Sequence, residues 1–208
     1  MGTESHTSDR VLSILLKEPF VTHTATSIAK SLNITRQGTW KILNRLAKNK
    51  LINLEFVGDS KTSIATIKLN WSNPATEKTL SLTLTKESFK QQRWRANFTE
   101  LEKNVRFLIL FGSILNNPKE ANDIDILAVV NKKKFKAVEE ITAKVQQTQL
   151  KKIHLVDLTE GEFSQELKKT NKAYLDAVKK GAILYGQDNF IQFIGDLQKR
   201  IQKNLKKA

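Results

Sequence analysis

The stretch at residues 107–130, FLILFGSILNNPKEANDIDILAVV, has two apolar runs separated by a polar loop, and it decides the fold of the C-terminal half. Two acids, Asp123 and Asp125, open the second run. Because side chains alternate faces along a strand, both carboxylates are expected on one face. Like charges side by side repel unless a cation lies between them, and Mg²⁺ prefers such oxygen ligands. The pair therefore predicts a Mg²⁺ site that could also take Mn²⁺.

The residues around this pair predict that the metal holds a nucleotide. Gly112 and Ser113 end the first run, where glycine lets a backbone N–H approach a phosphate and serine adds a hydroxyl donor. Asp157 ends the next expected strand, and strand ends can converge on one rim of a sheet. The structural alternative is a surface hairpin with solvated acids and a coincidental Gly-Ser. His23 and His154, single histidines without evident partners, are expected to be structural.

The rest of the C-terminal half alternates between strand and helix patterns, which favours an α/β sandwich. The expected elements are strands over 106–111, 125–130 and 152–158, helices over 132–149 and 162–180, and then a short strand, a Gly turn and a basic terminal helix.

The first seventy residues show a different order of patterns. After MGTESHTS, which is expected to be disordered, helical spacing recurs within SDRVLSILLKE, THTATSIAKSL and RQGTWKILNRLAKNK. Thr22 or Thr24 and then Thr35 are the expected caps of the second and third helices. The period then changes to two in LINLEFV and SIATIKLN, with a turn at Gly58-Asp59, which predicts a hairpin. This order resembles the winged helix-turn-helix family of bacterial and archaeal regulators.

The resemblance implies that the third helix enters the major groove of DNA. Its polar face has residue types that contact bases and phosphates, and the wing tip could reach the backbone or minor groove. DNA is favoured over RNA because nothing resembles an aromatic RNA platform. The alternatives are a solvated basic face or a protein-binding face. The expected nucleic-acid-binding residues are Thr35, Arg36, Gln37, Lys41, Asn44, Arg45 and Lys61.

Between the two modules lies a segment with few helix breakers, which we interpret as a helical connector. The expected domains are a winged helix over 8–70, the connector over 71–100 and an α/β domain with a basic terminal helix over 101–208. Winged-helix regulators are commonly dimers, so a homodimer stays open, with the connector as the best candidate for its interface.

Composition and charge limit the classes of binding partner and the cellular location that we expect. With 35 Lys+Arg against 21 Asp+Glu, the net charge of +14 favours a polyanionic partner, although solvated lysines would give the same excess. The absence of cysteine excludes disulfides and thiolate metal sites. No apolar run is long enough to span a bilayer, so we expect a cytoplasmic protein with no membrane contact.

The C-terminal motif resembles the nucleotidyltransferase superfamily of the DNA polymerase beta type, in particular its minimal members. The shared pattern is LFGS, nine intervening residues and DIDILAVV. The resemblance implies an α+β protein in which an α/β nucleotidyltransferase domain with a small mixed sheet follows the winged helix and connector. Gly112 and Ser113 would hold the triphosphate, and Asp123 and Asp125 the metal ions. Asp157 would ligate a metal and help deprotonate the acceptor hydroxyl.

The loop after Ser113 departs from the pattern of this superfamily. Its members usually carry a basic residue and a Gly soon after the Ser, whereas ILNNPKE follows here. Either Lys119 substitutes in binding the nucleotide, or the loop takes another shape at Pro118.

Two functions of different classes follow from these motifs. The first is a Mg²⁺-dependent nucleotidyltransferase that moves an NMP from an NTP, with ATP expected, to an unidentified acceptor while the winged helix binds DNA. The second is a DNA-binding regulator whose nucleotidyltransferase-like domain is catalytically idle or senses a nucleotide. The three acids favour the first function, and the altered loop favours the second.

Overall fold

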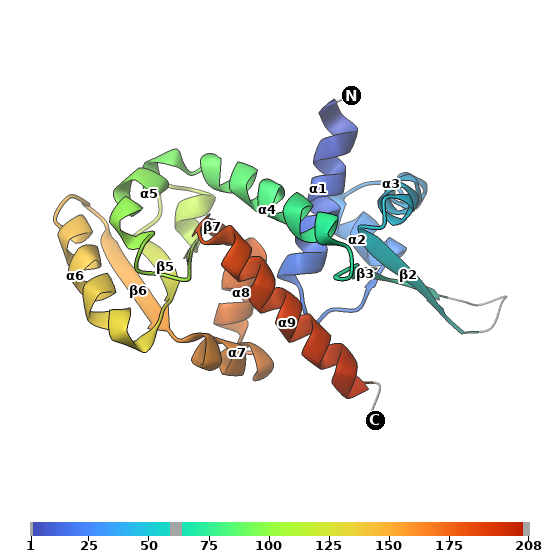
Figure 1. Ribbon diagram of the computed structural model, residues 1–208. Helices are drawn as coiled ribbons and strands as arrows, with labels where there is room; N and C mark the ends of the chain where they lie inside the picture. The colour runs from blue at the N-terminus through green and yellow to red at the C-terminus, as the bar shows by residue number, and fades with distance from the viewer. Residues whose placement is uncertain (1, 59–63, 206–208) are drawn as a thin grey trace. The chain divides into compact units, whose positions relative to one another are not determined.

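The computed structural model describes residues 2–58 and 64–205, and the chain divides into two compact units (Figure 1). Unit 1 comprises Met1–Thr83 together with Ile194–Ala208, and unit 2 comprises Leu84–Phe193. The predicted domain boundaries at residues 70 and 100 stay predictions. None of the helices in the described ranges has the length and apolar character needed to cross a membrane.

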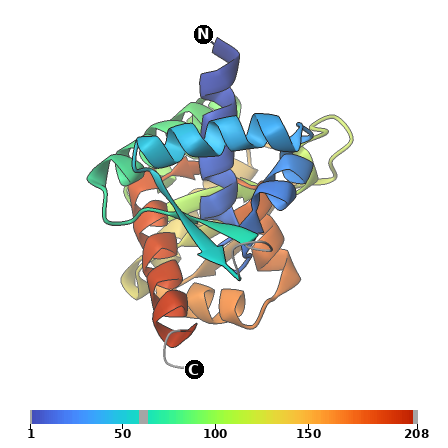
Figure 2. The same cartoon turned by 90° about the vertical axis from the view of Figure 1, so that its right-hand side faces the viewer.

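Unit 1 contains a winged helix-turn-helix, as the sequence predicted. Its sheet is antiparallel with the order β1-β3-β2, and Figures 1 and 2 show the hairpin that follows the two helices of the motif. Its elements are α1 (Gly2–Lys17), β1 (His23–Thr24), α2 (Ala25–Leu32), α3 (Arg36–Lys48), β2 (Ile52–Val57) and β3 (Ile64–Leu69). The expectation of disorder before residue 8 is wrong, because α1 already begins at Gly2.

Threonine caps fix where the two helices of the motif begin. The Thr24 hydroxyl accepts a hydrogen bond from the Ser27 N–H and the Ser27 hydroxyl accepts one from the Thr24 N–H, which forms a capping box for α2. The Thr35 hydroxyl caps α3 by accepting from the Gly38 N–H at 3.0 Å. Thr24 and Thr35 are therefore confirmed as caps.

The segment between the modules is helical, as predicted. It forms α4 (Pro74–Phe89), α5 (Gln92–Asn97) and a 3₁₀ turn, η1 (Thr99–Leu101). The division between the units falls within α4 and also within the terminal helix α9 (Gln187–Leu205). In unit 1, the end of α9 is held by Gln198, which accepts from the Trp71 indole at 2.9 Å and donates to the Leu15 carbonyl at 2.8 Å.

Unit 2 is built on a small mixed sheet, as expected, and its strand order is β6-β5-β4-β7. Strands β5 and β6 run parallel, whereas β4 is antiparallel to both β5 and β7. The remaining elements of the unit are β4 (Phe107–Phe111), η2 (Ser113–Leu115), β5 (Asp123–Val129), η3 (Lys132–Lys134), α6 (Phe135–Gln146), β6 (Lys152–Leu158), α7 (Glu160–Lys168), α8 (Lys172–Lys180) and β7 (Ala182–Tyr185).

Apolar side chains on both faces of this sheet are buried, so its central strands read as continuous apolar runs. On one face, Ile124 and Ile126 of β5 join a core with Phe98 and Val138. On the other face, Phe107 packs against the rings of Phe163, Phe190 and Phe193. Strand alternation places Asp123 and Asp125 on this second face, at the end of the sheet where β5 begins.

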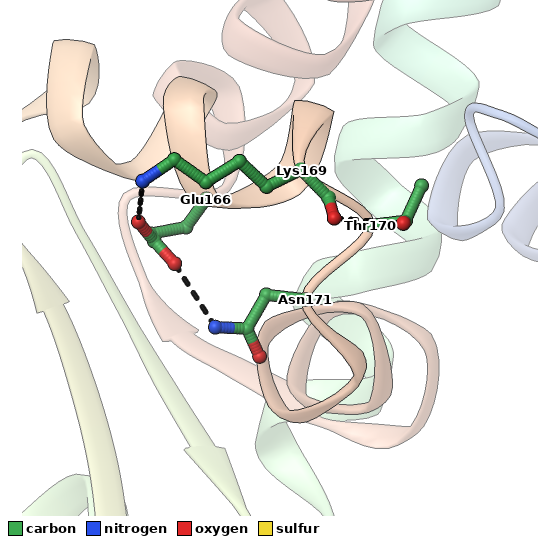
Figure 3. Close-up of polar contacts among 4 residues, drawn as sticks. All are labelled: Glu166, Lys169, Thr170 and Asn171. Atoms are coloured by element: carbon green, nitrogen blue, oxygen red, sulfur yellow. Dashed lines mark hydrogen bonds and ion pairs between the residues drawn. The ribbon is translucent and has the colours of Figure 1, made fainter.

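The single helix expected over 162–180 is in fact two helices, α7 and α8. Thr170 has a φ of 53°, which an α-helix does not accommodate. Figure 3 shows the Glu166 carboxylate accepting from Lys169 at 2.8 Å and from the Asn171 amide at 2.9 Å. The Asn171 carbonyl oxygen caps α8 by accepting from the Ala173 N–H. This network stabilises the break without any Gly or Pro.

Candidate metal and nucleotide site

Two aspartates at the start of β5 form the centre of the candidate site. Asp125 lies opposite Phe111 of β4 and beside His154 of β6, while Asp123 lies beside Lys152. The side chain of Asp123 is 32% exposed and that of Asp125 is 24% exposed. The carboxylates are therefore partly desolvated yet open to a ligand.

Gly112 brings the backbone of the Gly-Ser corner against the Asp125 carboxylate. Its φ is +81°, a conformation that favours glycine. A Cβ atom at this position would lie 2.3 Å from Asp125 Oδ2, which is shorter than any real contact. The absence of a side chain at Gly112 is thus what lets this carboxylate occupy its place.

His154 is the third polar group at the two carboxylates. Its Nδ1 lies 3.3 Å from Asp123 Oδ2 and 3.4 Å from Asp125 Oδ1. The side chain is 45% exposed, because β6 is an edge strand of the sheet. The expectation that His154 lacks partners and has only a structural role does not fit this position.

Asp125 is electrostatically strained in the absence of a cation. Burial raises the pKa of the Asp125 carboxyl, and the nearby Asp123 charge raises it further. The hydrogen bond and charge of His154 oppose this shift of the pKa. A cation bound between the carboxylates would relieve the remaining cost of ionising both.

The structure does not bring Asp157 to this pair, which corrects the expectation that three acids converge on one rim. Because β5 and β6 run parallel, the start of β5 lies beside the start of β6, whereas Asp157 lies near the end of β6 and opposite Ala128. Three positions along a strand are about 10 Å. Strand alternation also places Asp157 on the opposite face from Asp125. Its Oδ2 is buried there and has no hydrogen-bond partner among the residues that the structure describes.

The predicted nucleotide-binding residues lie at different parts of the loop. Ser113 is exposed and begins the η2 turn next to Gly112, where its carbonyl accepts from the N–H groups of Asn116 and Asn117. Lys119 lines a pocket of about 420 Å³ with Ile124, whose side chain points to the face opposite Asp123. Ser113 thus directly follows Gly112, whose backbone lies against the Asp125 carboxylate, whereas Lys119 lines a pocket with a residue of the opposite face.

The donor atoms suit a divalent cation. One oxygen from each aspartate and one ring nitrogen of His154 lie within 4.8 Å of one another, close enough for one ion to reach all three. Two carboxylates beside a Gly-Ser corner fit Mg²⁺, which usually combines one or two carboxylates with phosphate oxygens. The imidazole nitrogen departs from an all-oxygen set.

The position of His154 could have been found from the sequence. Parallel neighbours enter a sheet at the same edge, so the third residue of one expected strand lies near the third residue of the other. Asp125 is the third residue of β5, and His154 is the third residue of β6. The pairing of Asp125 with His154 was missed because the strand was predicted to begin at residue 125 and not at residue 123.

The predicted nucleic-acid-binding residues of unit 1 differ in their exposure. Most of them are exposed, but the Arg45 guanidinium donates to the Ser8 hydroxyl of α1 at 2.7 Å and is half-buried, so it is not on the exposed face of α3. Lys61 lies outside the described residues. The exposed predicted residues of the motif are Thr35, Arg36, Gln37, Lys41 and Asn44.

Comparisons with known proteins find a family model that matches the C-terminal part of the chain. Residues 96–189 match the family model described as "Polymerase beta, Nucleotidyltransferase". No curated protein matches the chain. A solved structure with some likeness is the adhesin competence repressor from Streptococcus pyogenes, at 17% identity and a TM-score of 0.33. That alignment covers 45% of this chain and 65% of the repressor. The winged-helix assignment therefore rests on the elements and strand pairing of unit 1.

Proposed function

We propose that unit 2 is a metal-dependent nucleotidyltransferase that moves an NMP from an NTP, with ATP expected, to an acceptor hydroxyl. One observation carries this proposal. The Asp125 carboxylate occupies the space beside the Cα of Gly112, so the metal-binding pair and the Gly-Ser corner form one site. The family match of residues 96–189 supports the same reaction class.

Each residue has a distinct task in this reaction. The Gly112–Ser113 corner would hold the triphosphate, and Asp123 and Asp125 would hold Mg²⁺ or Mn²⁺. When bound, the cation neutralises negative charge on the phosphates. The acceptor oxygen attacks the α-phosphorus, its proton leaves to solvent or a base, and the bond to the β-phosphate breaks to release pyrophosphate. The protein contributes mainly orientation and electrostatics, as phosphoryl transfer generally requires.

Label transfer tests this function directly. The protein is incubated with α-labelled NTPs and Mg²⁺ or Mn²⁺, alone and with cell extract. We expect labelling of an acceptor that falls at least about a hundredfold in Asp123→Ala, because positioned charges at such sites are worth that much. Asp157→Asn is the matched control and should retain labelling. Loss of labelling in Asp157→Asn with an intact fold would contradict the assignment of the site.

A second function is favoured by a specific observation. The third position of the site holds an imidazole instead of a carboxylate, and the loop after Ser113 has no basic residue before Lys119. A DNA-binding regulator that senses a nucleotide without transferring it would need only the residues that bind the metal and the nucleotide. Metal-dependent nucleotide binding without transfer to any acceptor would establish this alternative.

For unit 1 we propose DNA binding through the exposed face of α3. Its exposed Arg36, Gln37, Lys41 and Asn44 are residue types that contact bases and phosphates. The net charge of +14 supports a polyanionic partner. We also propose that the protein forms a homodimer and is located in the cytoplasm.

A further inference from the structure

Building on the proposed nucleotidyltransferase site, we infer that His154 is itself a metal ligand. This mixed nitrogen–oxygen site selects Mn²⁺, or a similar first-row divalent cation, over Mg²⁺. The inference concerns the choice of metal and the ligand that sets it, whereas the proposed reaction needs only a divalent cation on the two aspartates.

The register of the sheet supports this role. His154 pairs with Asp125 across the parallel strands, so its side chain emerges on the same face as both carboxylates. Asp157, which the family resemblance assigned as third ligand, points to the other face. His154 is therefore the side chain that occupies the position of a third ligand.

Direct contacts support the role independently of the register. Nδ1 of His154 lies 3.3 Å from Asp123 Oδ2 and 3.4 Å from Asp125 Oδ1, so one nitrogen faces both carboxylates. A histidine that only filled core space would be buried, but this side chain is 45% exposed. Small side-chain rotations would let a cation replace the direct contact between the ring and the acids.

Ligand preference then decides which cation binds best. Mg²⁺ is a hard ion that favours oxygen ligands and gains little from an imidazole. Affinity of nitrogen-containing sites for first-row metals increases along the series that starts with Mn²⁺, and imidazole suits these ions. Mn²⁺ also accepts carboxylate and phosphate oxygens, so it satisfies all donors of a nucleotide-loaded site.

The experiment measures metal binding without any turnover. Calorimetric titration of the full chain with MnCl₂ and with MgCl₂, at one fixed pH and without nucleotide, gives the two affinities. Pulsed electron paramagnetic resonance of the Mn²⁺-loaded protein then detects coupling to a directly bound imidazole ¹⁴N. We expect tighter Mn²⁺ than Mg²⁺ binding and a ¹⁴N signal in the unmodified protein.

Three variants identify the ligand. His154→Ala should abolish the ¹⁴N signal and weaken Mn²⁺ binding at least about tenfold, since loss of even outer partners of metal ligands costs 10–100-fold. It should affect Mg²⁺ binding less. His154→Asp should tighten Mg²⁺ binding and reduce the preference for Mn²⁺. His6→Ala, which removes an exposed histidine of α1, is the matched control and should change neither affinity.

The outcomes separate this inference from the proposed function. If both metals bind and Asp123→Asn abolishes binding while His154→Ala changes nothing, His154 is no ligand, but the site for nucleotidyl transfer stands. If neither metal binds, with or without an NTP, the metal-dependent function fails as well. Equal affinity for Mn²⁺ and Mg²⁺ together with a ¹⁴N signal would overturn the inferred preference for Mn²⁺ but would still show that an imidazole binds the metal.

Discussion

The contrast between His154 and Asp157 shows how a single strand direction decides the chemistry of a site. The sequence placed the strand over 152–158, and the structure agrees. The alternation of side chains in the sequence also predicted that Asp123 and Asp125 lie on one face of β5. The strand–helix–strand order of β5, α6 and β6 favours parallel neighbours, and parallel pairing places His154, not Asp157, beside Asp125. With that direction, the candidate site gains an imidazole and loses a carboxylate.

At the residue scale, Asp125→Asn should raise the melting temperature of the metal-free protein at pH 7. Because the pKa of Asp125 is raised in the folded state above its ordinary value of 3.8, the folded protein is penalised once this carboxyl ionises. The stabilisation should shrink as the pH falls and should vanish well below pH 3.8, where the carboxyl is protonated in both the folded and the unfolded state. Thermal melts across this pH range are the measurement.

Added Mn²⁺ provides the control for this prediction. It should stabilise the unmodified protein by binding the folded state and should stabilise Asp125→Asn less. A variant that melts below the unmodified protein at pH 7 without metal would show that Asp125 is not strained.

At the scale of elements, caps and breaks determine where helices end in unit 2. Helical spacing over 162–180 predicted one helix because no Gly or Pro interrupts it. Polar side chains make the break instead, with Glu166 bound to Lys169 and Asn171 and with the Asn171 side chain capping α8. Such networks join residues across the break, so a periodicity argument misses them, although Asn is a common cap residue.

The capping box of α7 gives a prediction at this scale. The Glu162 carboxylate accepts from the Thr159 N–H at 2.8 Å and from its hydroxyl at 2.7 Å, which lowers the pKa of Glu162 below 4.5. A lowered pKa means stability that is present above pH 4.5 and is lost as the pH falls through the folded-state value. Glu162→Gln should therefore lower the melting temperature at pH 7.

Thermal melts between pH 7 and pH 3 test this prediction. The difference between the melting temperatures of the variant and the unmodified protein should shrink towards the acidic end. Glu139→Gln, on the exposed face of α6, supplies the same chemical change outside a capping box. A destabilisation by Glu162→Gln that is independent of pH would mean that lost packing, not lost charge, is responsible.

At the scale of the molecule, the order of patterns along the sequence predicted a winged helix, a helical segment and an α/β domain, and the family resemblance implied the small mixed sheet of that domain. Assignment of the last helix was less direct. Sequence continuity joined it to the C-terminal domain, whereas Ile194–Ala208 belongs to the compact unit of the winged helix. The Trp71–Gln198 hydrogen bond links residues far apart in sequence, which no local pattern reveals.

DNA binding is the prediction that involves the charge of the whole chain. Lys41→Ala on α3 should weaken binding to duplex DNA and lower the slope of log affinity against log salt by about one, as for one lost phosphate contact. Fluorescence anisotropy at several salt concentrations measures this slope. Lys168→Ala, which removes an exposed lysine of α7, should leave it unchanged. Equal effects of the two variants would indicate nonspecific attraction to net charge.

The most direct test of the metal–nucleotide site is the binding of α,β-methylene-ATP, which cannot transfer its nucleotidyl group, with and without a divalent cation. The account predicts that Mn²⁺ or Mg²⁺ tightens binding at least about tenfold, and that Asp123→Asn or Asp125→Asn removes this gain. Affinity that is the same with and without metal, or that both substitutions leave unchanged, would contradict it.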